Sequence, residues 1–260
     1  MAKLEKIPTR TFTLYDGRVT IDFYEKYGNY KHVYIRRDNG EWLKSVTKAI
    51  SILNKPALIP WACKMMEEKI FFILDTIGKI TRPDITMAKN AHREFKDKAA
   101  DKGTMAHDLI SEYIKFKLKE IKKMPPMPED DEVKNCYLAF RDWETTHKVK
   151  FVSTEKLVYS EKYNFVGTLD CVAIVDGEFC LIDFKTSNGI YHDYIYQVSG
   201  YGIAYEEELK KTFDRNWIVR FGKDTGEFEA KPFQTDAKLQ KAFLSCLYLV
   251  MIEDDVKKLL

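Results

Sequence analysis

VGTLDCVAIVDGEFCLIDFKTS, residues 166–187, is the stretch of sequence that decides the fold. β-Branched and aromatic residues lie on both sides of Asp176-Gly177, and this dipeptide is typical of tight hairpin turns. The pattern predicts two antiparallel strands, 165–175 and 179–184, joined at that turn.

Two carboxylates interrupt these apolar strands. Asp170 and Asp183 stand equally far from the turn, so the hairpin places them roughly opposite each other. Facing carboxylates repel one another unless a cation lies between them, and hard oxygen ligands favour Mg²⁺ or Mn²⁺. Lys185 follows Asp183 by two positions, and the two-residue period of a strand puts both side chains on one face.

This combination of groups predicts a reaction. A bound metal lowers the pKa of water and polarises a phosphoryl oxygen, while an ammonium group stabilises the charge that develops on the phosphate. We therefore expect a hydrolase of phosphodiester bonds. The alternative without function is a structural ion pair between Asp183 and Lys185, together with an Asp170 that begins a turn.

Four short motifs occur in a definite order along the chain: GTMAH at 103–107, GTLD at 167–170, DFKT at 183–186 and QVSGY at 197–201. This ordered set resembles the PD-(D/E)XK nuclease superfamily, and its RecB-like branch most closely. Upstream, SVTKAISIL and KPALIPW (residues 45–61) are similar to the start of the phage exonucleases and the mitochondrial genome maintenance exonuclease.

The resemblance implies a role for each motif residue. As metal ligands it implies His107, Asp170, Asp183 and the backbone carbonyl of Phe184. As further catalytic groups, beside the two aspartates, it implies Lys185, Glu155, Gln197 and Tyr201. In this scheme Lys185 positions the attacking water, while the glutamine and tyrosine hold the active-site strand and touch the backbone of the scissile strand.

Each of these motif residues also has an ordinary structural interpretation. His107 recurs with Ile110 and Ile114 at helical spacing, which is typical of a core histidine. Glu155 could be a solvated residue of the first core strand. Gln197 and Tyr201, four positions apart, share a helix face and could make an ordinary polar contact.

The resemblance also implies the architecture. We expect an α/β protein with a restriction-endonuclease-like core, in which helices flank a mixed sheet. We divide the chain into an N-terminal β-ribbon (1–44), a helical layer that carries the G-x-x-x-H motif (45–128), and the nuclease core with a C-terminal helix (129–260). The three form one compact unit, and helix 104–119 belongs to the core.

Periodicity and turn residues predict the remaining elements. Further strands are expected at 11–15, 18–27, 31–37, 151–159 and 217–221. Helices are expected between 45 and 119, with breaks at 54–60, 78–84 and 101–103, and again at 132–147, 191–209 and after Thr235.

Charge is distributed unevenly along the chain. Residues 1–128 carry 25 basic and 16 acidic side chains, whereas residues 129–260 carry 17 and 24. A basic half suits a polyanion such as DNA, although ordinary solvated charge on helix faces is the more common cause of such numbers. The resemblance implies that the helical layer arches over Asp170 and Asp183 and admits one flexible strand. Candidates to line that passage are Lys48, Lys64, Arg93, Lys96 and Lys102.

Basic and aromatic residues also alternate in the segment 30–42. Stacking on bases and contact with phosphates is one interpretation of this segment, and an ordinary exposed hairpin is the other.

The sequence argues against a membrane or secreted protein. Its longest apolar stretch, 242–252, is far shorter than the roughly 20 residues of a membrane span, and the first twelve residues do not resemble a signal peptide. We expect a cytoplasmic protein, in the bacterial host cell if it is viral. The five cysteines are scattered, so we expect reduced and largely buried thiols. Only Cys246 follows the Gln-Tyr motif, so no iron–sulphur cluster is expected.

Together these observations predict a deoxyribonuclease that uses one or two Mg²⁺ or Mn²⁺ ions. The leading expectation is a single-stranded DNA exonuclease of the phage type, acting in DNA replication, recombination or repair. A structure-specific endonuclease with the same centre is one alternative. A nucleic-acid-binding module that has lost catalysis is the other, and the intact set of Asp170, Asp183 and Lys185 argues against it.

Overall fold

The structure is a computed structural model that describes residues 7–260. The first six residues of the expected ribbon segment lie outside the described residues. The strands are β1 (Arg10–Leu14), β2 (Val19–Tyr27), β3 (Tyr30–Arg36), β4 (Trp42–Ser45), β5 (Lys150–Ser160), β6 (Phe165–Val175), β7 (Glu178–Lys185), β8 (Arg215–Phe221) and β9 (Phe228–Phe233). The helices are α1 (Val46–Ile50), α2 (Leu58–Ile77), α3 (Arg82–Ala88), α4 (Ala91–Lys117), α5 (Asp131–Thr146), α6 (His192–Leu209) and α7 (Ala237–Lys257).

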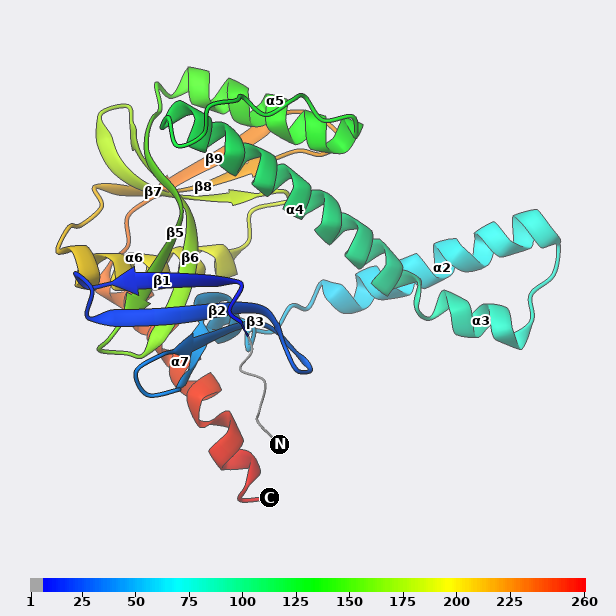
Figure 1. Cartoon of the computed structure of the whole chain (residues 1–260). Coiled ribbons are helices and arrows are strands. Elements are labelled where there is room, and N and C mark those ends of the chain that lie inside the picture. The colour runs from blue at the N-terminus through cyan, green and yellow to red at the C-terminus, as the bar shows by residue number, and fades with distance from the viewer. Residues whose placement is uncertain (1–6) are drawn as a thin grey trace.

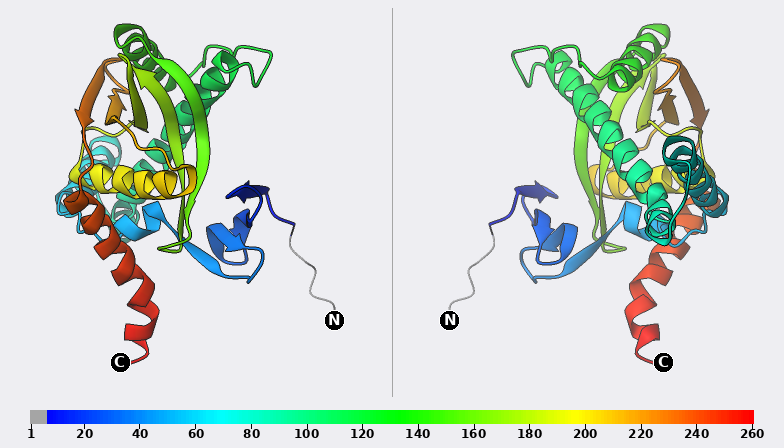
Figure 2. Two further views of the ribbon diagram at one scale, coloured as in Figure 1. Left: turned by 90° about the vertical axis from the view of Figure 1, so that its left-hand side faces the viewer. Right: turned by 90° about the vertical axis from the view of Figure 1, so that its right-hand side faces the viewer.

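The strands form one mixed sheet, shown in Figure 1. Its order is β1-β2-β3-β4-β6-β7-β8-β9, and β5 pairs with β6 beside this path. β4 runs parallel to β6 and β7 runs parallel to β8, while the other neighbours are antiparallel. α4 and α6 cover opposite faces of the central strands, as the two side views of Figure 2 show. The predicted α/β fold, a mixed sheet flanked by helices behind an N-terminal β-ribbon, is confirmed.

Each face of the sheet has its own apolar core. On one face, Ile110 and Ile114 of α4 pack with Phe140 of α5, because their helical spacing directs them toward the strands. On the other face α6 packs against α7 through Gly200, where a Cβ atom would lie 2.6 Å from the Phe243 ring. Only glycine allows this close approach, so the second core depends on it.

The hairpin between β6 and β7 has the predicted register. Val175 pairs with Glu178, and the ladder continues to Cys171 opposite Ile182. Asp170 and Asp183 are the next positions along, and the ladder does not extend to them. The two strands therefore separate where their carboxylates begin.

The helical layer differs from the prediction at 101–103. These residues lie within α4, which runs unbroken from Ala91 to Lys117. A glycine in the interior of a helix, such as Gly103, is about 1 kcal/mol less favourable than alanine, and this cost is the reason that a break was expected here. Tertiary packing overrides that cost, because a Cβ at this position would lie 2.9 Å from Thr186 Oγ1 and would prevent α4 from approaching the end of β7.

The expected arch over the catalytic strands is also absent from residues 7–260 in this conformation. α2 packs mainly on α3 and α4, and α2 and α3 project from the body as an arm (Figure 1). The unbroken α4 explains this difference, since its N-terminal half carries both helices away from the sheet.

Two further features concern surface and core chemistry. Within residues 7–260, no helix combines the length and the apolar character that a membrane span requires. The five cysteines are free thiols, and four of them are buried while Cys63 is exposed.

Candidate active site

Asp170 and Asp183 meet where β6 and β7 separate. The Asp170 side chain takes the place of the missing ladder partner, because its Oδ2 accepts a 2.8 Å hydrogen bond from the Phe184 N–H. A quarter of the Asp170 side chain is exposed, whereas Asp183 is only 1% exposed. The hairpin thus presents one accessible and one buried carboxylate to the same place.

Asp183 is buried without the hydrogen bonds that such a group normally has. Neither of its carboxylate oxygens accepts a hydrogen bond of good geometry from a described residue, although Lys185 Nζ lies 2.7 Å from Oδ2. Burial raises the pKa of Asp183 to about 6, with Lys185 opposing the rise and Asp170 adding to it. Burial likewise raises the pKa of Asp170 against the opposing charge of Lys185. A buried carboxylate with a raised pKa and no well-aligned hydrogen bond is more common at functional sites than in structural strands.

Lys185 lies on the face of β7 that also carries Asp183, as the period of the strand predicts. Its Nζ donates to Gln197 Oε1 at 3.1 Å and lies 4.7 Å from the centre of the Tyr194 ring. Burial alone would lower the pKa of Lys185, but Asp183 and Asp170 outweigh it and the net shift is upward. The ammonium group is therefore charged at neutral pH and fixed in direction.

Gln197 and Tyr201 connect α6 to this lysine. Gln197 Nε2 donates a hydrogen bond to the Tyr201 hydroxyl at 2.9 Å, while its Oε1 accepts one from Lys185 Nζ at 3.1 Å. Tyr201 in turn packs on Gly167, where a Cβ would lie 2.6 Å from Tyr201 Cε1. The glycine of the G-T-L-D motif thus provides the space that this tyrosine occupies.

His107 reaches the site from α4. Its Nδ1 lies 3.8 Å from Asp170 Oδ2, too far for a hydrogen bond. Burial lowers the pKa of His107 to about 4, and Lys185 lowers it further while Asp183 opposes the change. The imidazole is therefore neutral at neutral pH, which is the form that binds metals.

Glu155 also lies at the site. It stands in β5 between Thr154, which pairs with Cys171, and Lys156, which pairs with Leu169, and so faces the position of Asp170. Its backbone has a φ of +46°, an unusual value within a strand that costs roughly 1–3 kcal/mol. Lys115 Nζ lies 3.2 Å from Glu155 Oε2. The strained backbone directs the carboxylate toward the same cavity as Asp170.

A cavity of about 10 Å³, room for one water-sized particle, lies between α4, β5 and the ends of β6 and β7. It is lined by His107, Ser111, Thr154, Glu155, Asp170 and Phe184. The Ser111 hydroxyl is buried without a hydrogen-bond partner among the described residues. Sequence analysis missed Ser111 and Tyr194, although their spacings from His107 and Gln197 place them on the same helix faces.

The donor set suits a divalent ion such as Mg²⁺ or Mn²⁺. The carboxylates of Asp170 and Glu155 and the neutral imidazole of His107 line the cavity. The buried Asp183 does not line it and has Lys185 as its charged partner. Among residues 7–260, however, no three His, Cys, Asp or Glu side chains are grouped closely enough to hold a metal ion as they stand. Lys185 currently contacts the Asp183 oxygen, so metal binding would require its ammonium group to shift away.

Several basic residues named from the sequence have acidic partners. Lys102 contacts both Asp130 and Glu132, and Lys64 lies 3.7 Å from Glu68. In the N-terminal ribbon, Arg36 pairs with Asp38 and Arg37 with Asp22. These contacts weaken the case that those side chains bind phosphates.

The chain is similar to several solved structures. The match to a crystal structure of SSO0001 covers 44% of this chain and 54% of the SSO0001 chain, with 13% sequence identity and a TM-score of 0.31. The match to an alkaline exonuclease from Laribacter hongkongensis covers 46% of this chain and 64% of the exonuclease chain (13% identity, TM-score 0.34). The match to the same exonuclease in complex with dAMP covers 59% of this chain and 86% of the exonuclease chain (13% identity, TM-score 0.36).

The chain therefore spans less than two thirds of the first two of these structures. No family model and no curated protein matches it. We accordingly base the function on the geometry of the site.

Proposed function

We propose that this protein is a metal-dependent DNA nuclease that hydrolyses phosphodiester bonds. The observation that carries the proposal is the buried ion pair of Asp183 and Lys185, whose charged atoms lie 2.7 Å apart at the point where Asp170 stands on the neighbouring strand. A purely structural strand would gain nothing from such a costly arrangement.

The site residues take distinct roles in this proposal. Asp170, Asp183 and His107 hold one or two Mg²⁺ or Mn²⁺ ions, with the Phe184 carbonyl as a further ligand and Glu155 in support. When bound, the metal supplies a water of lowered pKa and polarises a phosphoryl oxygen. Lys185 orients the attacking water and stabilises the charge that develops on the phosphate.

Gln197 acts through Lys185. Its amide accepts from the ammonium group at 3.1 Å and is itself fixed by the Tyr201 hydroxyl at 2.9 Å. The two α6 residues therefore hold Lys185 in the direction that the reaction needs. Because Lys185 is already held in place by Gln197 and Tyr201, less entropy is lost when the transition state forms, and this support raises the rate.

The resemblance of the motifs to phage and mitochondrial exonucleases favours single-stranded DNA, cut from an end, as the substrate. It also favours a role in DNA replication, recombination or repair inside a cell, with a phage origin of the chain. An endonuclease with the same centre is the second candidate. One observation favours it, since α2 and α3 pack on α4 and leave the catalytic strands without a cover that would force a strand to enter by its end.

The test compares three DNA substrates of equal length with Mg²⁺ in one buffer: a linear single strand, a closed single-stranded circle and a blunt duplex. Selective loss of the linear strand supports the exonuclease, and rapid loss of the circle supports the endonuclease. Failure to cleave any of them with Mg²⁺ or Mn²⁺ would refute the nuclease proposal.

A further inference from the structure

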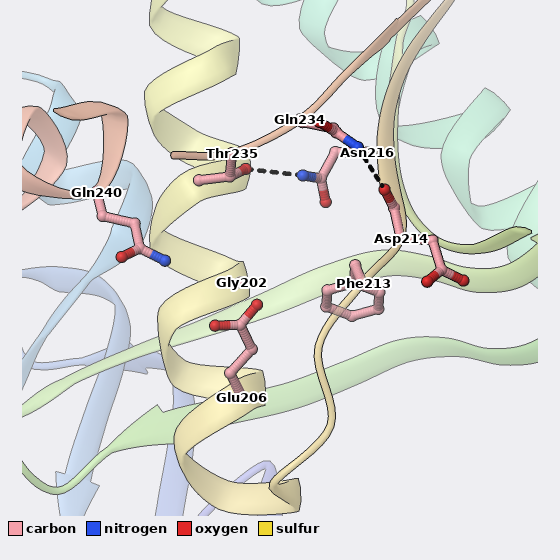
Figure 3. A pocket seen from close by; sticks show the side chains of 8 residues that line it. All are labelled: Gly202, Glu206, Phe213, Asp214, Asn216, Gln234, Thr235 and Gln240. Atoms are coloured by element: carbon pink, nitrogen blue, oxygen red, sulfur yellow. Dashed lines mark hydrogen bonds between the residues drawn. The ribbon is translucent and has the colours of Figure 1, made fainter. Parts of the chain in front are cut away.

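A cavity of about 120 Å³ on the α6 side of the sheet does not suit DNA. It lies around Asn216, between α6, the start of β8 and the connection from β9 to α7 (Figure 3). Its charged lining residues, Glu206 and Asp214, are both acidic, so a polyanion would be repelled. The N-terminal ribbon, β1 to β4, has the opposite character.

The ribbon carries four aromatic rings that lie together, here called the aromatic cluster: Tyr24, Tyr27, Tyr30 and Trp42. The ring centres of Tyr27 and Tyr30 lie 5.4 and 5.3 Å from that of Trp42, and the Tyr24 ring adjoins Tyr27 at 4.9 Å. Trp42 is 46% exposed and Tyr30 is 63% exposed. Leu43 packs into the core beneath the ribbon, so the alternation of β4 turns its neighbour Trp42 away from that core.

The exposed rings of the aromatic cluster do not serve the packing of the ribbon on the body. That packing uses Leu14, Ile21 and Leu43, which are buried with residues of β5 and β6. No helix packs closely against β2 or β3, and the ribbon lies at the margin of the molecule (Figure 2). Large apolar groups that are exposed together are typical of a binding surface. Flat rings open to solvent are the groups on which the unpaired bases of a single strand stack.

Two lysines beside the aromatic cluster favour a polyanion as the partner. Lys26 and Lys31 stand directly opposite each other in the pairing of β2 with β3, and both are exposed. Like charges in this position destabilise a pair of strands, and within residues 7–260 neither ammonium group has an acidic partner. Alternation turns Glu25 to the other face of the ribbon. The phosphates of a DNA strand would supply the missing negative charge.

The ribbon is joined to the strand that carries Asp170. β4 pairs in parallel with β6, with Lys44 opposite Phe165. Trp42 precedes Lys44 by two positions, and Asp170 follows Phe165 by five. At about 3.3 Å per residue, Trp42 and Asp170 therefore lie roughly 23 Å apart along the strands. A stacked strand of roughly seven nucleotides, at about 3.4 Å each, spans that length.

We propose that the aromatic cluster, together with Lys26 and Lys31, forms an auxiliary site for a single DNA strand that also reaches the catalytic centre. Unpaired bases stack on Tyr30 and Trp42, and the two lysines contact the phosphates between them. The proposal rests on the proposed nuclease function for the identity of the strand as DNA. It gives a physical reason for a preference for single strands, because the bases of a duplex are already stacked on one another.

The test measures binding, by fluorescence anisotropy of the full-length protein in EDTA. The probes are three labelled DNAs of equal length: a thymidine strand, a strand with abasic sites in place of all its bases, and a blunt duplex. The abasic strand keeps the phosphates and lacks the groups that stack. We expect the thymidine strand to bind at least about fivefold more tightly than the abasic strand.

Variants of the ribbon separate stacking from charge. Tyr30→Ala and Trp42→Leu, of which the second keeps apolar bulk, should each weaken binding of the thymidine strand at least about fivefold and leave the abasic strand and the duplex unchanged. Tyr248→Ala removes a tyrosine of α7 that is also 63% exposed, and it should change none of the three affinities. Lys26→Gln combined with Lys31→Gln should weaken both single strands alike and reduce the dependence of their binding on salt. Thermal unfolding reports that each variant is folded.

Strand length provides a further readout. The affinity of the wild type should rise between strands shorter and longer than roughly seven nucleotides, and the two aromatic variants should lose most of that rise. The proposal is overturned if the abasic strand binds as tightly as the thymidine strand. It is also overturned if both folded aromatic variants bind as the wild type does, which would leave the exposed rings to a protein partner.

These outcomes are independent of cleavage. A protein that cuts DNA but binds it without the help of Tyr30 and Trp42 refutes only the auxiliary site. A protein that binds single strands through these rings but cuts none of them with Mg²⁺ or Mn²⁺ refutes only the nuclease proposal.

Discussion

The buried carboxylate Asp183 should make the metal-free protein less stable as pH rises. Its pKa is raised from 3.8 to about 6, and a rise of that size corresponds to about 3 kcal/mol between the ionised and neutral forms. For an acid whose pKa is raised in the folded state, the stabilising contribution is complete below 3.8 and is lost as pH passes through about 6. An asparagine has nearly the same shape and cannot ionise.

We therefore expect Asp183→Asn to gain stability relative to the wild type by about 2 kcal/mol between about pH 4 and about pH 7, most of the full effect of about 3 kcal/mol. The measurement is urea unfolding in EDTA at both pH values, with the exposed Asp142→Asn as a matched control that should show no such gain. Adding Mg²⁺ at neutral pH should stabilise the wild type and not Asp183→Asn. A pH-independent difference between wild type and variant would refute this reasoning.

Three other predictions concern the surroundings of the site. Gly167→Ala should destabilise the fold by about 1 to 3 kcal/mol in thermal unfolding, because its Cβ would meet Tyr201 Cε1 at 2.6 Å, and an unchanged melting temperature would contradict that packing. Gln197→Ala should lower kcat about ten- to a hundredfold with little change in KM, because it removes the hydrogen bond that holds Lys185 in place. Gln197→Glu should restore part of the rate. A change in KM alone would argue against a positioning role for Gln197. Cleavage should require Mg²⁺ or Mn²⁺ and should stop in EDTA. Ca²⁺ should inhibit it, because Ca²⁺ prefers ligand distances of about 2.3 to 2.6 Å, which a site built for a smaller ion provides poorly. Full activity in a chelator would exclude the proposed centre.

Local sequence patterns were enough to predict the hairpin that carries Asp170 and Asp183. The turn at Asp176-Gly177 sets the register, and the register determines that Asp170 and Asp183 stand opposite each other. The two-residue period then places Lys185 beside Asp183. These inferences succeed because every interaction involved lies within a few residues of the turn.

Features that depend on distant segments were missed. β4 pairs in parallel with β6 through only two residue pairs, and its four residues show no pattern of their own. α4 continues through Gly103 because Thr186, far along the chain, needs the space. A prediction from helix propensity includes the unfavourable contribution of Gly103 but not its packing against Thr186, and it therefore placed a break in the helix.

The cavity around Asn216 could not be predicted either. Its side chains come from α6, β8 and α7, and none of them forms a recognisable motif in sequence. The cavity forms only when these elements and their connections are assembled.

The central claim is that Asp183 and Lys185 form the catalytic centre of a nuclease. The most direct test is the initial rate of cleavage of a labelled linear single strand with Mg²⁺ by Asp183→Asn and Lys185→Ala. Asp142→Asn and Lys134→Ala, which alter exposed residues of α5, serve as controls. We predict that each site variant loses at least about a hundredfold in rate while it remains folded and binds DNA, and that both controls cleave as the wild type does. Near-normal cleavage by either folded site variant would contradict the claim.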